Sequence, residues 1–331
     1  MIPKLTHCPG TLAPGFDTYS RTSLKRVFDG RKVSHILPYE APNSGAPTDK
    51  LFEENQKRIS ISGVQEKFSI VLEKNKLRLI KKGERGTHIL KPIPNSGKKR
   101  DQMPANEHLT MQIARQVYGI ETAENALIFF KKGNPAYITK RFDVQLGGSK
   151  KAKEDFASLA GKTPQTHGDH YKYEGNYLEL FELMKKYLPA YRVETPKLFK
   201  ILLFNYLFSN GDAHLKNFAI IETPMGDHRL SPAYDLLNTR IHIEDSDFAL
   251  DGLLPAQLAQ THVAGQFKVL SEQVGLSSKQ FNTIIASMLK GSDQVNTLTM
   301  ASFLDEKTKR NYLQAYQTRI NNLGASPRGM N

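Results

Sequence analysis

Two carboxylates and one amide stand at spacings suited to phosphoryl transfer. The stretch SNGDAHLKN, at 209–217, places Asp212 five residues before Asn217, and Asp235 follows in SPAYDL. In phosphoryl transfer one aspartate orients and deprotonates the attacking hydroxyl, while an asparagine and a second aspartate hold Mg²⁺ against the nucleotide phosphates. These residue types at these spacings indicate a phosphotransferase site with Asp212 as the candidate general base.

The flanking segments predict the elements that would position this loop. Residues 197–208 (KLFKILLFNYLF) are mostly apolar helix formers, so we expect a buried helix that Asn210-Gly211 ends. The apolar run FAII, turn residues near 224–227 and a weaker strand predict a hairpin before Asp235. Helix, polar loop, hairpin and aspartate follow one another in this order in protein kinases. A helix end with a solvated aspartate would leave the hairpin and Asp235 unexplained.

A second segment, PQTHGDH, superficially resembles the His-Gly-Asp brace of small-molecule phosphotransferases. Counting five residues onward from Asp169 gives Glu174 instead of asparagine, and no further aspartate stands at a suitable distance. His167 and His170 lack a third nearby metal ligand, and we expect no regular helix here. The segment therefore reads as a polar loop.

Composition limits the class of protein. The chain has 331 residues, of which 39% are hydrophobic and 24% charged, which suits one large globular domain or two lobes. No apolar stretch approaches the roughly 18–20 residues that span a bilayer, and the N-terminus lacks a signal-peptide pattern. A single cysteine, Cys8, fits a reducing compartment. We expect a cytoplasmic protein without membrane contact, although export as an effector stays open.

The net charge of +13 raises the question of nucleic-acid binding. The basic groups are scattered, and each stands in a predicted turn or loop where solvated charge is normal. They are Lys81-Lys82, Lys98-Lys99-Arg100, Lys131-Lys132 and Lys150-Lys151. No nucleic-acid-binding motif accompanies them, so we expect no direct binding of nucleic acid outside a complex.

The first half of the chain predicts a sheet that could cover a nucleotide. The small, polar Ser60-Ile61-Ser62-Gly63 precedes a run of strands, although such a loop alone is more often an ordinary turn. The expected strands are 68–72, 77–81, 87–91, 126–130 and 136–140, with an amphipathic helix at 103–118. Lys91 at a strand end could reach the α- and β-phosphates, and Glu107 in the helix could pair with it.

Several motifs occur in the order in which HipA-like serine/threonine kinase toxins carry them. They are ISGVQEK, THILKP, NEH before a helix, TKRFD, EDF, SNGDAHLKN and SPAYDL. The resemblance runs from about Arg58 to Asp235 and continues more loosely toward the C-terminus, and the chain is most similar to the short HipT form. It implies an α+β, bilobal protein-kinase-like fold of the HipA type. An N-terminal extension (1–57) would precede a β-rich N-lobe (58–143) and a mainly helical C-lobe (144–331).

The same resemblance implies the roles of individual residues. Asp212 would be the general base, Asn217 and Asp235 the Mg²⁺ ligands, and ATP and Mg²⁺ the cofactors. The implied ATP-binding residues are Ser62, Gly63, Val64, Gln65, Glu66, Lys67, Lys91, Lys140, Phe142, His214, Lys216, Asn217 and Asp235.

Two positions carry further expectations from the resemblance. Lys140 replaces the glutamate of the long HipA form, so a side-chain contact to the nucleotide would differ, while backbone recognition of adenine around Lys140 and Phe142 would persist. Ser60 and Ser62 match the autophosphorylated Ser-Ile-Ser pair of HipT-like proteins. A phosphoserine adds about −1.5 to −2 charge, which would repel ATP and switch the kinase off.

The resemblance also implies a function and partners. The expected activity is a toxin kinase that phosphorylates a serine of an aminoacyl-tRNA synthetase, with the tryptophanyl enzyme favoured, and thereby halts translation. A HipS-like small antitoxin and a HipB-like DNA-binding antitoxin are the expected partners. A small-molecule phosphotransferase and a catalytically idle kinase-fold regulator remain alternatives. Intact Lys91, Asp212, Asn217 and Asp235 weigh against the idle regulator.

Overall fold

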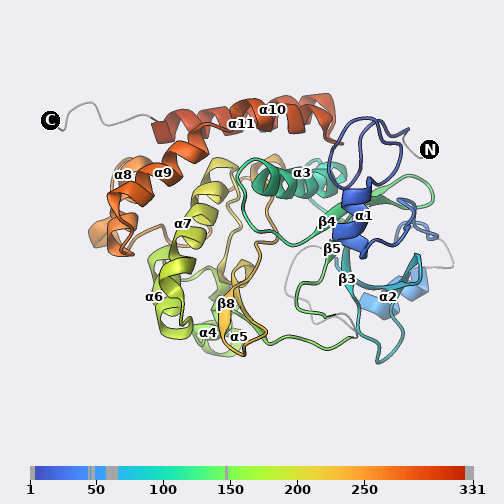
Figure 1. Cartoon of the computed structure of the whole chain (residues 1–331), viewed down its shortest axis with the longest axis horizontal. Helices are drawn as coiled ribbons and strands as arrows, with labels where there is room; N and C mark the ends of the chain where they lie inside the picture. Colours follow the sequence, from blue (N-terminus) through green and yellow to red (C-terminus); the bar gives the residue numbers. More distant parts are fainter. Residues whose placement is uncertain (1–3, 44, 46–48, 57–65, 146–147, 325–331) are drawn as a thin grey trace. The chain divides into compact units, whose positions relative to one another are not determined.

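The computed structural model describes residues 4–43, 45, 49–56, 66–145 and 148–324 (Figure 1). The chain divides into two compact units. The first comprises 1–112, 123–150 and 297–309, and the second comprises 113–122, 151–296 and 310–331. Each unit therefore combines segments that lie far apart in the sequence.

The first unit contains a five-stranded antiparallel sheet with the order β2-β1-β3-β5-β4. Its strands are β1 (Phe68–Glu73), β2 (Lys76–Leu79), β3 (His88–Pro92), β4 (Asn125–Phe129) and β5 (Pro135–Lys140). All five strands expected from the sequence are confirmed, with ends shifted by one or two residues. Short runs rich in β-branched and aromatic residues, punctuated by turn residues, are sufficient to specify such strands.

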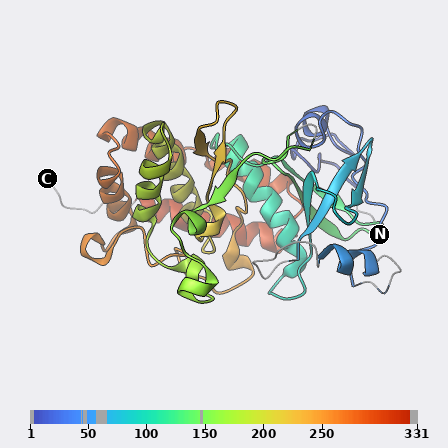
Figure 2. The same ribbon diagram turned by 90° about the horizontal axis from the view of Figure 1, so that it is seen from below.

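The N-terminal residues share the hydrophobic core of this sheet. Helices α1 (Arg21–Phe28) and α2 (Asp49–Gln56) supply Phe28 and Phe52 to a core that also contains Phe68. In Figure 2, α2 (blue) lies beside the β1–β2 hairpin (cyan). Tyr19 is also buried and donates a hydrogen bond from Oη to Leu127 O at 2.6 Å. Large aromatic side chains dominate the energy of such cores, so these segments form part of the unit's core.

Helix α3 (Met103–Gln116) is buried on almost every side, so the expectation of a simple amphipathic helix is wrong. Its buried polar side chains include Asn106, Glu107, His108 and Gln112. Buried polar groups must find partners, and Gln112 Nε2 donates to Asn125 Oδ1 at 2.9 Å. Polar residues on this helix therefore bond inside the protein instead of facing solvent.

The second unit is mainly helical. Helices α6 (Tyr177–Tyr187) and α7 (Tyr191–Leu207) lie side by side (Figure 1), and α7 begins earlier than the sequence predicted and includes Pro196. A three-stranded antiparallel sheet has the order β6-β7-β8, with β6 Lys153–Asp155, β7 Ala219–Glu222 and β8 His228–Leu230. The other helices of this unit are α4 (Phe156–Leu159), α5 (Pro164–His167), α8 (Val263–Gln273) and α9 (Ser278–Leu289), and the two units share α10 (Ser292–Ala301) and α11 (Glu306–Gly324). The expected hairpin before Asp235 is confirmed as β7–β8.

The segment PQTHGDH does contain a short helix, so its prediction as a loop without regular helix is wrong. Thr163 and Thr166 form a reciprocal capping box around α5, and Pro164 occupies the first turn. Capping satisfies orphan backbone N–H groups, and proline at this position is preset for a helix. Gly168 then ends the turn at φ 71°.

Across the described residues, no helix combines the length and apolar character needed to cross a bilayer.

Candidate active site

The candidate catalytic loop begins where α7 ends. Ser209 takes the left-handed conformation with φ 52°. The N–H of Ser209 donates to Tyr206 O, and that of Asn210 donates to Asn205 O, at 3.2 and 2.9 Å. This pair of bonds is a Schellman helix end, which normally carries glycine at the left-handed position. Serine there carries a backbone cost of order 1–3 kcal/mol, and the bonds fix the direction in which the loop leaves the helix.

Asp235 lies beside this loop although it follows much later in the sequence. Asn217 Nδ2 donates to Asp235 Oδ2, and Asn210 Nδ2 donates to the Asp235 carbonyl, both at 3.4 Å. Asp235 itself has φ 57°, an uncommon left-handed backbone for a residue other than glycine. The structure thus brings together the two residues that the sequence nominated as magnesium ligands.

Hydrogen bonds also fix the residues between Asp212 and Asn217. The Asn217 Oδ1 atom accepts the His214 N–H at 3.1 Å, and Tyr234 Oη donates to Lys216 O at 2.7 Å. Lys216 Nζ lies 3.0 Å from Oδ2 of Asp155, which belongs to the EDF motif. Burial alone would lower the pKa of Lys216, but hydrogen bonding to Asp155 and its charge outweigh burial and raise it. Lys216 is therefore held as a cation.

The candidate base Asp212 accepts a hydrogen bond from a tyrosine. Tyr173 Oη donates to Asp212 Oδ1 at 2.8 Å, and its ring packs edge-on against His214 with 5.2 Å between ring centroids. Burial, followed by the charge of Asp212 and this bond, raises the pKa of Tyr173. From α6, Tyr177 Oη donates to Ala213 O at 2.7 Å. Two tyrosines thus contact the candidate catalytic loop, at Asp212 and at the residue that follows it.

Thr239 braces the loop from the segment that follows Asp235. Its Oγ1 accepts the Gly211 N–H at 3.0 Å and lies 3.0 Å from Ser209 O and 2.5 Å from Asp245 Oδ2. A Cβ on Gly211 would lie 2.5 Å from both Asp245 Oδ2 and Ser246 O. Because no side chain fits there, the loop can pack this closely only with glycine at 211.

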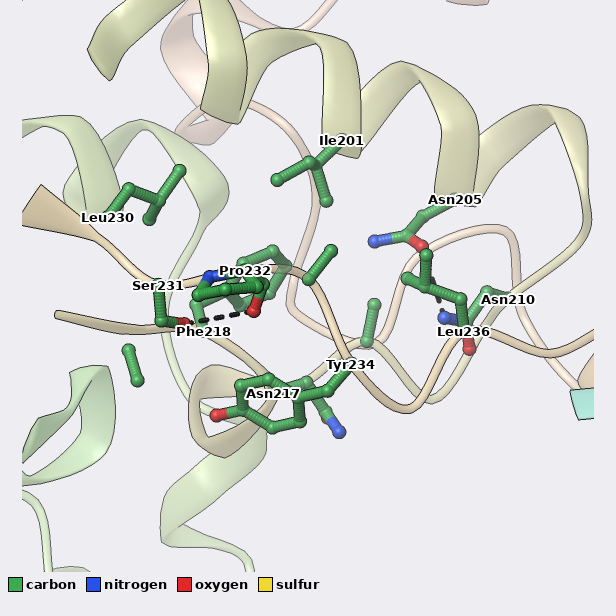
Figure 3. Close-up of a pocket in the computed structure, with 13 residues that line it drawn as sticks. Ile201, Asn205, Asn210, Asn217, Phe218, Leu230, Ser231, Pro232, Tyr234 and Leu236 are labelled. Atoms are coloured by element: carbon green, nitrogen blue, oxygen red, sulfur yellow. Dashed lines mark hydrogen bonds between the residues drawn. The ribbon is translucent and has the colours of Figure 1, made fainter. Parts of the chain in front are cut away.

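A small cavity lies behind the loop, and Figure 3 shows the side chains that line it. Asn205 and Asn210 meet there through a 3.1 Å hydrogen bond, drawn as a dashed line. The cavity has a volume of about 10 Å³, which is near the minimum needed to hold one water molecule. The cavity is far too small for a nucleotide and belongs to the packing behind the loop.

The donor set of Asn217 and Asp235 fits magnesium. Mg²⁺ is commonly held by one or two carboxylates together with substrate phosphates and water. The Asp235 carboxylate lies beside the Asn217 amide, whose nitrogen donates to it and whose oxygen accepts the His214 N–H. Among the described residues, no cluster of three or more His, Cys, Asp or Glu could form an all-protein metal cage. Two oxygen donors are the set expected where phosphates complete the coordination.

In the first unit, Lys91 and Glu107 form the ion pair expected from the sequence. Lys91 Nζ lies 2.6 Å from Glu107 Oε1, and their side chains are 5% and 1% exposed. Lys91 also lies 5.4 Å from the ring centroid of Tyr137, its partner in β5. Burial without a partner would be costly for either charge, so the pair fixes the lysine amine in one place.

Lys140 is engaged by the N-terminal segment. Its Nζ lies 2.5 Å from Oδ1 of Asp29, the residue that caps the C-terminus of α1. Both side chains are partly exposed, and nothing in the motif pattern indicated this pair. Phe142, beyond the end of β5, is half-buried, and the preceding N–H of Arg141 donates to Thr87 O at 2.9 Å.

The loop predicted to cover the nucleotide is described only at its end. Ser60, Ser62, Gly63, Val64 and Gln65 lie outside the described residues. Glu66 Oε1 accepts a hydrogen bond from Asn95 Nδ2 at 3.1 Å, and Lys67 is half-buried just before β1.

Sequence reasoning missed four residues around the candidate catalytic loop, none of which belongs to a motif. Tyr173, Tyr177 and Thr239 contact loop residues far from them in the chain. Asp245 lies against Thr239. For Tyr173 and Asp245, the sequence holds no signal that could have identified them. Gly211 gave a partial signal, because glycine directly before a candidate base indicates close packing.

Comparison with known proteins identifies related sequences. A model of the HipA-like C-terminal domain matches residues 59–295, more than half of the chain. A candidate kinase from Haemophilus influenzae is 22% identical over 331 residues, covering 91% of each protein. Candidate kinase Y4dM of Sinorhizobium fredii is 33% identical over 209 residues, which cover 59% of this chain and 48% of that relative. The chain thus spans about half of the latter protein.

Two solved structures resemble the fold. HipA of Shewanella oneidensis MR-1, solved with HipB and its operator DNA, matches with a TM-score of 0.58 and 21% identity over 79% of this chain and 63% of HipA. The Helicobacter pylori proinflammatory kinase CtkA matches with a TM-score of 0.51 and 13% identity over 80% of this chain and 92% of CtkA. The expectation of an α+β, kinase-like fold of the HipA type is confirmed.

Proposed function

Because this chain belongs to the family defined by the HipA-like C-terminal domain, we propose that it is an ATP- and Mg²⁺-dependent serine/threonine protein kinase that acts as a toxin. One observation carries the proposal: Asp212, Asn217 and Asp235 stand on one hydrogen-bonded framework in the second unit. The buried Lys91–Glu107 pair in the first unit adds the charged lysine that kinase chemistry needs.

In the proposed reaction Asp212 acts as the general base. It accepts the proton of the substrate serine hydroxyl as that oxygen bonds to the γ-phosphorus and ADP leaves. Asn217 and Asp235 would hold Mg²⁺, which when bound supplies positive charge to the phosphate oxygens. Their side chains already lie beside one another, joined by a hydrogen bond from Asn217 Nδ2 to Asp235 Oδ2, and metal binding would replace that bond.

Basic and small residues would bind the rest of the nucleotide. Lys91 would contact the α- and β-phosphates, and His214 and Lys216 would line the phosphate site. Lys216 is suited to this because Asp155 keeps it charged. Residues 62–67 would cover the nucleotide, and the backbone near Lys140 and Phe142 would contact adenine. The side chain of Lys140 would keep its bond to Asp29.

The substrate and partners are proposed from the family. The acceptor would be a serine of an aminoacyl-tRNA synthetase, with the tryptophanyl enzyme as the first candidate, so that modification halts translation. Ser60 and Ser62 would be sites of autophosphorylation. Because the related HipA was solved with HipB and DNA, a HipB-like antitoxin is the proposed partner. A HipS-like small antitoxin is proposed as a second.

Labelled ATP tests this proposal directly. The purified chain is incubated with γ-labelled ATP, Mg²⁺ and a soluble cell extract, followed by phosphosite mapping. We expect label on a synthetase serine and on Ser60 or Ser62, with both signals lost in Asp235→Asn. Label on a metabolite without labelled protein would instead support a small-molecule phosphotransferase. Full labelling by folded Asp235→Asn would contradict the proposed metal site.

A further inference from the structure

Tyr173 donates a hydrogen bond to the candidate base at the distance that a substrate hydroxyl would take. A general base must lie within about 2.6–3.2 Å of the hydroxyl oxygen whose proton it takes. Tyr173 Oη meets that requirement at 2.8 Å from Asp212 Oδ1. A serine hydroxyl that approached Asp212 Oδ1 would therefore compete with the tyrosine hydroxyl.

The tyrosine is suited to act as a persistent hydrogen-bond donor. Burial first, and then the charge of Asp212, raise the pKa of Tyr173, so its hydroxyl keeps its proton at neutral pH. The ring packs edge-on against His214, and Lys172 Nζ lies 4.9 Å from the ring centroid. These contacts orient the hydroxyl toward the base.

The segment that carries Tyr173 is exposed before Tyr171 and half-buried from Tyr171 onward. Residues 164–175, here called the Tyr173 arm, are exposed throughout 164–170. The arm is anchored at its C-terminal end, where Asp251 and Gly175 exchange hydrogen bonds at 2.9 and 3.2 Å and Lys162 Nζ donates to Glu174 O at 2.8 Å. Segments with few buried apolar contacts open at low free-energy cost, so the arm can swing from this anchor.

We propose that Tyr173 is an acceptor-mimicking gate, which keeps the base engaged until a protein substrate displaces the Tyr173 arm. This inference rests on the proposed function, since it takes Asp212 as the base. While Tyr173 donates its hydrogen bond to Asp212, the base is less available to a water molecule. Water is therefore a poor substitute for the substrate hydroxyl as the phosphate acceptor. A protein substrate that contacts the exposed arm would free Asp212 and supply its own serine hydroxyl.

The test measures ATP hydrolysis, in which water is the acceptor, by the full-length Tyr173→Phe variant with Mg²⁺. A hydrogen bond to a charged group shifts an equilibrium by roughly tenfold or more. Because ring packing remains, we expect kcat for hydrolysis to rise by about tenfold, with KM for ATP unchanged. Tyr187→Phe is the matched control, because Tyr187 lies on α6 and its Oη is 3.5 Å from Leu159 O. That variant should hydrolyse ATP as the wild type does.

The results that would contradict the gate can be told apart from those that would contradict the proposed function. An unchanged or lower kcat in folded Tyr173→Phe overturns the gate, as does an equal rise in Tyr187→Phe. Tyr173→Leu, which keeps apolar bulk without the hydroxyl, provides the same test if the phenylalanine variant melts early. If the wild type hydrolyses ATP and Asp212→Asn abolishes that hydrolysis, Asp212 is needed for catalysis. A negative result for Tyr173→Phe then contradicts the gate but not the proposed function. If the wild type neither hydrolyses nor binds ATP with Mg²⁺, the proposed function fails, and the gate with it.

Discussion

The first compact unit holds Lys91 in a buried ion pair, whereas the second holds the loop of Asp212 through a network of several hydrogen bonds. Lys91 and Glu107 lie between a strand and a buried helix, and each depends on the other for its charge. Around Asp212, backbone groups of Ser209 and Gly211 and the hydroxyl of Thr239 share the positioning. Losing a member of the pair should therefore affect folding, while a disturbance of the network should affect geometry and activity first.

The strongest test of this difference is Asp212→Asn. General base catalysis contributes about 10²–10⁴-fold, so we expect kinase activity to fall by that factor with little change in melting temperature. The measurement is transfer of labelled phosphate beside a thermal melt. Asp17→Asn, at an exposed position of the first unit, is the matched control and should leave activity unchanged. Equal losses of activity in the two variants would contradict the role of Asp212 as the base.

Glu107→Ala should show the opposite pattern. Removing one member of a buried ion pair leaves an uncompensated charge and costs about 3–5 kcal/mol, so the free energy of unfolding should fall by that amount. Denaturant unfolding of the variant measures it. Glu73→Ala is the control, because the Glu73 side chain in its pair with Arg78 is 61% exposed, and such pairs contribute about 0–1 kcal/mol. A small loss for Glu107→Ala would show that Lys91 does not depend on the pair.

Gly211→Ala should disturb the network without unfolding the chain. The added methyl group would lie 2.5 Å from Ser246 O, so the loop must move. A misplacement of about 1 Å can cost of order 100-fold in rate, and we expect kcat to fall by about ten- to hundredfold. Gly265→Ala, in α8 with its nearest neighbour at 3.4 Å, should retain full activity. Wild-type kcat in Gly211→Ala would show that the loop tolerates movement.

Mild acid should weaken the first unit before the second. Burial lowers the pKa of His88 and His108, both in the first unit, to about 4. The unfolded chain takes up these protons near pH 6.5, while the folded chain does not until about pH 4. Stability is therefore complete above about pH 6.5 and falls toward pH 4, by up to about 1.4 kcal/mol per pH unit for each histidine.

Hydrogen exchange at pH 7 and pH 5 measures this effect. Amides of the five-stranded sheet should lose protection at pH 5 earlier than those of α6 and α7. His108→Gln should reduce the dependence of the melting temperature on pH by about half. Identical pH dependence in wild type and variant would assign the acid sensitivity to other groups.

Much of the fold could be predicted from local pattern. Strands β1 to β5 and helix α7 follow from runs of apolar residues between turn residues, because burial of such runs outweighs most local preferences. The Lys91–Glu107 pair could be predicted too, because the sequence places Lys91 at a strand end and the oppositely charged Glu107 in the helix that follows. The short helix α5 was missed because Thr163 and Thr166 act through capping, which the polar composition of the segment obscured.

The residue types of the site and their order can be read from the sequence alone: an aspartate and an asparagine on one loop, and a second aspartate after a hairpin. The residues that surround them can be found only in the folded chain. Tyr173 on Asp212, Asp155 on Lys216 and Thr239 behind Gly211 are contacts between residues far apart in the chain. Spacing along a chain encodes local geometry, whereas such contacts depend on how separate segments pack, and no single segment carries that information.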